Sequence, residues 1–203
     1  MPQSQRERAR AVLAKSGIAR LVELRRAGVT AATVGRMERD GQVVRLGRGI
    51  YQLPDAELDA HHSLAEIAKR LPKAVICLTS ALALHGLTDR LPKRTWVAIG
   101  AKDWAPKVDD APLRIVRFTP RLLAQDVETH MIEKVPVRVF GVAKTIADCF
   151  RHRRAVGLDV ALEGLREALR QRKATASEIA RKAERGGVST VVRPYLEALT
   201  ANA

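Results

Sequence analysis

The chain has 203 residues, of which 46% are hydrophobic, so it can bury a packed core and wholesale disorder is excluded. No apolar run approaches the roughly 20 residues that span a bilayer. The N-terminal sequence MPQSQRERAR has no apolar core of the kind that secretory signals need, so we expect a cytoplasmic protein. Lys and Arg number 36 against 22 Asp and Glu, and the net charge of +14 favours a polyanionic partner.

The positive charge is concentrated at the N-terminal end of the chain. Residues 1–53 contain eleven Lys and Arg and four Asp and Glu, a net of +7. The other 150 residues also carry a net of +7, spread almost three times as thinly. A small, strongly basic segment is typical of a nucleic-acid-binding module, although charge alone is equally compatible with a basic but inert surface.

The pattern of residues 1–53 predicts three helices followed by a hairpin. We expect helices over 5–15, 20–27 and 31–40, with an extended link at 18–19. Gly28 stops the second helix and Thr30 is a suitable N-cap for the third. Residues 42–53 then alternate loosely around Gly47 and Gly49, which predicts a two-stranded hairpin. This order of elements is that of a winged helix-turn-helix, a fold that binds double-stranded DNA.

The third helix and the hairpin contain the residues that we expect to contact DNA. Val34 and Met37 are three apart and should face the core, so the opposite face should present side chains to the major groove. Arginine suits guanine or phosphate, and threonine suits phosphate or a thymine methyl group. A basic hairpin tip would lie along phosphates or in the minor groove. The candidate DNA-binding residues are Thr30, Thr33, Arg36, Arg39, Arg45 and Arg48.

We interpret residues 54–59 as a linker, and a second region follows it. The residues from 60 to 203 predict strands first and helices last, which favours an α+β domain over a wound parallel sheet. The strands are expected at 74–78, 96–99, 113–118, 129–132 and 135–140. The helices are expected at 60–71, 79–87, 142–151, 159–172, 177–184 and 191–199, with Thr79 or Ser80 capping the second.

Three blocks of sequence resemble the AbiEi family of antitoxins, in the order that the family has them. The first is ELRRAGVTAATVGRMERDGQVVRLGRGIYQL within residues 17–53, and the others are TSALALHGLTD at 79–89 and GVAKTIADCFR at 141–151. Asp148 stands at the acidic position of the last block. One departure is Arg20, where relatives tend to place a Thr or Ser that caps the second helix.

The resemblance implies a role in a type IV toxin–antitoxin system used in phage defence. The winged domain would bind inverted repeats upstream of its own operon and repress it. The C-terminal domain would neutralise a nucleotidyltransferase-like toxin, with or without direct contact. A plain transcriptional regulator without an antitoxin role remains an alternative.

Enzymatic chemistry finds little support in the sequence, and we expect no catalytic residue, no cofactor and no metal site. GVAKT at 141–145 lacks the glycine that precedes the lysine of a phosphate loop, and no His or Cys spacing matches a zinc site. A metal-dependent nuclease is the main enzyme alternative, but the acids that could serve it have no convincing arrangement. These acids are Asp103, Asp109, Asp110, Glu128, Glu133 and Asp148.

Aromatic side chains are only 3% of the chain, which disfavours the stacking platform of a single-stranded RNA module. We expect them to anchor the core instead, and they are Tyr51, Trp96, Trp104, Phe118, Phe140, Phe150 and Tyr195. Cys77 and Cys149 lie in apolar contexts and should be buried, reduced thiols. Basic clusters at 151–154 and 181–185 suit solvated helix ends or a second anionic contact.

Overall fold

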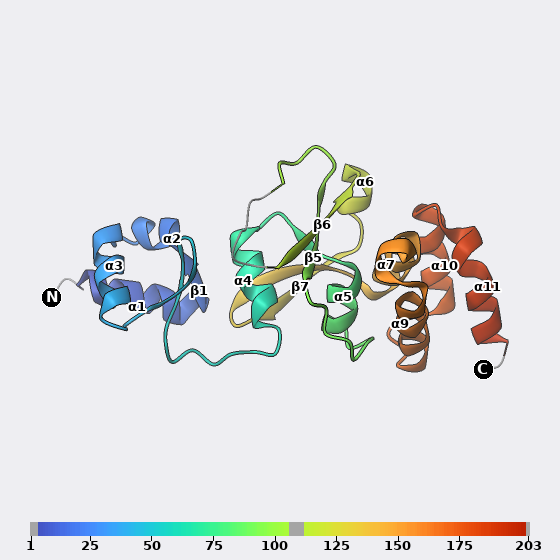
Figure 1. The fold of residues 1–203 in the computed structure, drawn as a ribbon, viewed down its shortest axis with the longest axis horizontal. Coiled ribbons are helices and arrows are strands. Elements are labelled where there is room, and N and C mark those ends of the chain that lie inside the picture. Colours follow the sequence, from blue (N-terminus) through green and yellow to red (C-terminus); the bar gives the residue numbers. More distant parts are fainter. Residues whose placement is uncertain (1–3, 106–111, 202–203) are drawn as a thin grey trace. The chain divides into compact units, whose positions relative to one another are not determined.

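A computed structural model describes residues 4–105 and 112–201 of the chain (Figure 1). The expected mixture of helices and strands is confirmed, and the chain divides into two compact units. Unit 1 contains the described residues up to Lys73 together with Thr129–Val137, and unit 2 contains the rest. The division therefore falls after Lys73, beyond the linker expected at 54–59.

Unit 1 begins with the helices and strands of a winged helix-turn-helix. Three antiparallel strands form a small sheet in the order β1-β3-β2. The extended link expected at 18–19 is in fact a strand, because Ile18 and Ala19 are fully buried and pair with β3. The elements are α1 (Gln5–Ser16), β1 (Ile18–Arg20), α2 (Leu21–Arg26), α3 (Ala31–Arg39), β2 (Val44–Gly47), β3 (Ile50–Gln52) and α4 (His62–Arg70).

Local sequence signals explain where the first helices begin and end. Ser4 and Glu7 form a capping box at the start of α1. The Thr30 hydroxyl accepts a hydrogen bond from the backbone N–H of Thr33, so the expected cap of α3 is confirmed. Between α2 and α3 the chain turns at Gly28, whose φ of +76° lies in the left-handed region that glycine adopts without strain. At Arg20, the Glu23 carboxylate accepts the backbone N–H and partly replaces the missing cap.

The core of unit 1 lies where α1, α2 and α3 meet the small sheet. Leu13 and Leu24 are buried there, and the expected inward facing of Val34 and Met37 is confirmed. On the hairpin the inward valine is Val43, whereas Val44 is 44% exposed.

Helix α4 packs against β1 and β3 rather than belonging to a separate domain. The Lys69 Nζ atom lies 3.1 Å from a carboxylate oxygen of Glu23, and an Arg70 guanidinium N–H donates to the Leu46 carbonyl at 3.0 Å. These two contacts join α4 to the second helix and to the hairpin of the winged domain.

The turn at Glu133-Lys134 completes unit 1 from a distant part of the sequence. The Glu133 carboxylate accepts from the Asp59 backbone N–H at 2.7 Å and lies 2.8 Å from His62 Nδ1. Lys134 Nζ donates to the Ala14 carbonyl at 2.6 Å. A Cβ at Gly17 would lie 1.9 Å from the Glu133 carbonyl oxygen, so only glycine permits this approach.

The chain after Lys73 forms a mixed sheet with strand order β6-β5-β4-β8-β7 and a group of C-terminal helices, and the adjoining parts of β7 and β8 are those counted with unit 1. Strands β4 and β5 pair antiparallel, whereas β5 with β6 and β4 with β8 pair parallel. Every expected strand and helix of this region is present, and two four-residue helices, α6 and α8, were not predicted. The elements are β4 (Val75–Ile76), α5 (Leu78–Leu84), β5 (Thr95–Gly100), β6 (Leu113–Phe118), α6 (Pro120–Leu123), β7 (Val127–Ile132), β8 (Val135–Phe140), α7 (Val142–Arg151), α8 (Arg153–Val156), α9 (Leu158–Arg170), α10 (Ala176–Arg185) and α11 (Ser189–Thr200).

The aromatic side chains of unit 2 anchor its core, with one exception. Phe118 and Phe140 are buried in contact with each other, and Phe150 stacks on Tyr195 with ring centroids 5.5 Å apart. The prediction for Trp104 is wrong, because its side chain is 86% exposed in the loop that follows β5. The expected hydroxyl cap of α5 is also wrong: Cys77 is the N-cap residue.

Helix α7 is buried along most of its length and holds an ion pair in the core. Lys144 Nζ lies 2.7 Å from Asp148 Oδ2, and both side chains are at most 5% exposed. The same ammonium lies over the rings of Phe140 and Phe118, at 4.1 and 4.9 Å from their centroids. Burial raises the pKa of Asp148, and the positive charge of Lys144 opposes that rise.

Both cysteines are free, buried thiols, as predicted. Burial raises the pKa of the Cys77 and Cys149 thiols well above the ordinary value, so both stay protonated and unreactive.

Candidate nucleic-acid interface

Helix α3 presents a smooth, positively charged outer face. Ala31 and Ala32 are exposed at its first turn, and Arg36 and Arg39 are exposed further along. Gly35 lies between them, and a Cβ placed there would meet nothing within 4 Å. Small side chains flanked by arginines allow a helix to approach base edges closely while the arginines reach outward.

Thr33 is not part of this face, which corrects the expectation from the sequence. Its side chain is 6% exposed, and its hydroxyl donates to the Gln5 side-chain oxygen at 2.8 Å. The same oxygen accepts the backbone N–H of Thr30 at 3.0 Å. Thr33 therefore fixes the start of α3 against α1, and the hydroxyl of Thr30 caps the helix.

The two arginines of α3 are held only by weak contacts. An Arg36 N–H lies 3.4 Å from the Thr33 hydroxyl, and Arg39 Nε lies 3.4 Å from the Gly35 carbonyl. Neither forms an ion pair within the part of the chain that the structure describes, so both guanidinium groups keep donors for an external acceptor.

The hairpin supplies two further exposed arginines. Arg45 on β2 donates from Nε to the Gly47 carbonyl at 3.2 Å, and Arg48 stands in the turn between the strands. Gly49 has a φ of +70°, so the tight turn itself depends on glycine. The structure thus places Arg45 and Arg48 together on the hairpin, as the sequence predicted.

Three of the four acidic groups of residues 1–53 are engaged away from the exposed arginines, and Glu38 on α3 is the fourth. Glu7 caps α1, Glu23 binds Arg20 and Lys69, and Asp40 pairs with Arg6 at 2.9 Å. For Glu23, burial acts to raise the pKa, but hydrogen bonds from the Arg20 backbone and from Lys69 outweigh it and lower the pKa. With eleven Lys and Arg against four acids, three of them engaged, the domain keeps a positive outer field.

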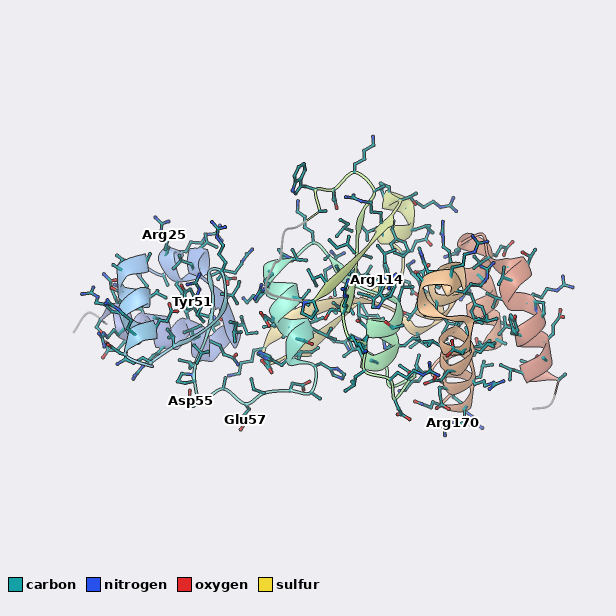
Figure 2. All side chains as sticks on the ribbon, in the orientation of Figure 1. Arg25, Tyr51, Asp55, Glu57, Arg114 and Arg170 are labelled. Carbon is teal, nitrogen blue, oxygen red and sulfur yellow. The ribbon has the colours of Figure 1, made fainter. Side chains whose placement is uncertain are left out.

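Two further exposed cations on α2 were missed in the sequence. Arg25 and Arg26 are adjacent, exposed and without an ion-pair partner among residues 4–105 and 112–201. Figure 2 shows Arg25 pointing outward from its helix. The dipeptide is visible in the sequence, but only the position of α2 ahead of the helix-turn-helix turn shows that it suits phosphate contacts.

Residues 7–54 match the family model of AbiEi_4, described as a transcriptional regulator and AbiEi antitoxin. The N-terminal domain is an AbiEi regulator domain. The match covers α1 through the hairpin, which are the elements that present the arginines. The resemblance of residues 79–89 and 141–151 to the same family lies beyond the match and stays a prediction.

A solved structure shares the fold over nearly the whole chain. The crystal structure of the RV2827C protein from Mycobacterium tuberculosis aligns with a TM-score of 0.63 and 14% sequence identity. The alignment covers 98% of this chain and 81% of that one. At this identity the likeness concerns the fold alone. No curated protein sequence matches the chain.

Several residues that suggested enzymatic chemistry have structural roles. Asp103 accepts the Gly100 backbone N–H at 2.8 Å, while Asp109 and Asp110 lie outside the described residues. The expected turn at GVAKT is confirmed, since Gly141 is the N-cap residue of α7 and Lys144 is buried in its ion pair. His85 ends α5, and its Nε2 lies 2.8 Å from the Phe140 carbonyl oxygen. None of the helices in the described ranges is long and apolar enough to cross a membrane.

Proposed function

We propose that this protein binds double-stranded DNA as the repressor of its own operon, with α3 in the major groove and the β2–β3 hairpin against the backbone. The observation that carries this proposal is the set of exposed arginines without carboxylate partners on α2, α3 and the hairpin. Arg36 is the candidate for reading a base, because it projects from the middle of α3 beside Gly35 and the exposed alanines. Arg39, Arg45 and Arg48 are better suited to phosphates or to the minor groove.

The antitoxin role is the second part of the proposal. The family match to an AbiEi antitoxin supports it. In this reading the protein acts in the cytoplasm, represses the operon through inverted repeats and neutralises a nucleotidyltransferase-like toxin from the same operon. Unit 2 would carry the neutralising function.

Binding of the full chain to its upstream DNA tests the repressor role. The retardation of a labelled upstream fragment is compared with that of a scrambled fragment of equal length, across a salt series and with Mg²⁺ present. We expect selective retardation of intact upstream DNA, with an affinity that falls steeply as salt rises, because several arginines displace counterions. Equal binding to both fragments would contradict sequence-specific repression, and shortened DNA would support the nuclease alternative instead.

Co-expression tests the antitoxin role separately. The neighbouring nucleotidyltransferase-like gene, expressed alone, should arrest growth, and this chain should restore it. An Arg36→Ala variant should still restore growth if neutralisation resides in unit 2. Failure of the wild-type chain to restore growth would leave a plain transcriptional regulator.

A further inference from the structure

Unit 2 contains a cavity lined by four cationic side chains and no carboxylate. Its volume is about 320 Å³, at the lower end of the roughly 300–1,000 Å³ that ligand pockets occupy. The cationic residues come from the loop before β5 and from β6. The lining residues are Thr79, Thr88, Arg90, Pro92, Lys93, Arg94, Trp96, Arg114, Val156 and Val160.

Arg90 already has its counter-ions. It donates to Asp159 at 2.7 Å and lies 3.1 Å from Glu163, whose carboxylate also accepts the Thr88 hydroxyl at 2.6 Å. The guanidinium of Arg90 lowers the pKa of Asp159. The acids beside the cavity are therefore committed to Arg90 and Thr88, and they cannot also neutralise the remaining cations.

The other three cationic residues of the cavity are Lys93, Arg94 and Arg114. All three are exposed, and none forms an ion pair among the residues that the structure describes. Three unpaired positive charges around one concave site repel each other, so an anion that entered would relieve that repulsion as well as gain hydrogen bonds.

Arg114 is oriented for such an anion. It is the cross-strand neighbour of Trp96 in the parallel β5–β6 pair, and its guanidinium carbon lies 4.3 Å from the centroid of the indole ring. The cation–π contact holds the guanidinium over the nearly buried ring, and its N–H donors remain available to an external acceptor. A guanidinium can bind two oxygens of a phosphate in a bidentate manner. Figure 2 labels Arg114 on β6, within the sheet of unit 2.

The cavity also offers neutral groups to the rest of a ligand. Pro92, Val156 and Val160 supply apolar surface. The Thr79 hydroxyl is buried and has no hydrogen-bond partner, so it is an unsatisfied polar atom at the edge of the site. We propose that this cavity binds a small phosphate monoester with an apolar or aromatic portion, the class to which nucleoside monophosphates belong. The residues that line this cavity differ from those of the proposed DNA-binding face.

Equilibrium dialysis of the full chain against each of the four ribonucleoside 5′-monophosphates tests the proposal, with adenosine and inorganic phosphate as partial ligands. We expect saturable binding of at least one monophosphate at one site per chain, competition by inorganic phosphate, and no binding of adenosine. Arg114→Gln should weaken the binding at least tenfold. The control variant Arg166→Gln removes another exposed arginine, on α9, that does not line the cavity, and it should bind as the wild type does.

A second readout reports on the cavity directly. The chain has two tryptophans, so Trp104→Phe leaves Trp96 beneath Arg114 as the only one, and its emission should change with the same saturation curve. Thermal unfolding of each variant confirms that it is folded. Absence of saturable binding of all four monophosphates would overturn the proposal. Equal losses of monophosphate affinity for Arg114→Gln and Arg166→Gln would also overturn it. If Arg114→Gln kept the monophosphate affinity of the wild type and bound only random duplex DNA more weakly, the cavity would instead be part of a DNA-contacting surface, and the proposal would be overturned.

Discussion

Arg36 is the single side chain on which the base-reading part of the proposed function depends. Among residues 4–105 and 112–201, its guanidinium forms one hydrogen bond, the 3.4 Å contact with the Thr33 hydroxyl, and no ion pair, so an external acceptor has no ion pair to break. We expect Arg36→Ala to cost about 1–3 kcal/mol of binding free energy on the upstream site. The loss on scrambled DNA should be smaller, because a base contact carries sequence information whereas a phosphate contact does not.

Titrations of both fragments with the wild type and the variant measure this difference. Arg10→Ala is a matched control, because Arg10 is an exposed arginine of α1 outside α3 and the hairpin. Equal losses on the two fragments for Arg36→Ala would assign Arg36 to the backbone instead.

For Thr33, one helical turn before Arg36, we expect a substitution to change the stability of the fold and to leave DNA binding unchanged. Its buried hydroxyl donates to Gln5, so Thr33→Val should destabilise the fold by about 1 kcal/mol, the usual value of one hydrogen bond. The affinity for DNA, measured where the variant is fully folded, should remain within twofold of wild type. Denaturant unfolding and fluorescence titration give the two quantities. If Thr33→Val left the stability unchanged and weakened DNA binding, Thr33 would be a DNA-contacting residue, as the sequence predicted.

At the scale of the elements, two glycines near α3 should respond to alanine in opposite ways. Gly28 has a φ of +76°, where a side chain is strained, so Gly28→Ala should cost about 1 kcal/mol or more. Gly35 lies inside α3 with open space at its Cβ position, so Gly35→Ala should stabilise the fold by roughly 0.5–1 kcal/mol. Chemical denaturation of both variants checks the signs. A stabilising Gly28→Ala would contradict the left-handed turn at Gly28, and a destabilising Gly35→Ala would contradict the open space at Gly35.

The elements that the sequence predicted are those with strong local signals. The Thr30 cap and the spacing of Val34 and Met37 defined α3, and the glycines around Arg48 defined the hairpin. Strand β1 was missed because a three-residue segment is too short to show the alternation of apolar and polar residues that marks a strand. Only its pairing with β3 makes it a strand. Thr33 was misplaced because its partner, Gln5, lies 28 residues away. Contacts between residues this far apart depend on tertiary packing, so no pattern in the neighbouring sequence indicates them.

At the scale of the whole molecule, the Lys144–Asp148 pair couples the stability of unit 2 to one buried charge. Lys144→Met should destabilise the protein by about 3–5 kcal/mol, because it leaves Asp148 buried without a counter-ion. The double variant Lys144→Met with Asp148→Leu should recover most of that loss, since it removes both charges. Thermal or denaturant unfolding measures both. A double variant no more stable than the single one would show that packing of the lysine chain matters more than its charge.

Acid should destabilise the folded chain through carboxylates whose pKa values folding lowers. Arg170 and Gln171 lower the pKa of Glu167 to about 2, and hydrogen bonds at Glu23 and Glu178 lower their pKa values as well. A lowered folded pKa gives stability that is fully present above the unfolded pKa of about 4.3 and is lost as the pH falls toward the folded value. Asp148 acts in the opposite direction, because burial raises its pKa.

The net effect should be a fall in unfolding free energy between about pH 4.5 and pH 2.5, measured by urea denaturation at intervals of half a pH unit. Glu23→Gln should reduce the fall, because its amide cannot titrate. A stability that rises over the same interval would show that Asp148 outweighs the lowered glutamates.

The contacts of Glu133 and Lys134 with Ala14, Asp59 and His62 have a consequence for how the protein is made. Ribosomes release the N-terminal end first, yet the groups that bind Asp59, His62 and Ala14 are translated more than seventy residues later. The nascent regulator domain therefore leaves the exit tunnel without its last partner. A gene fragment that stops soon after the hairpin would encode the helices proposed to face DNA. It would omit the Glu133-Lys134 turn, whose close approach requires glycine at position 17.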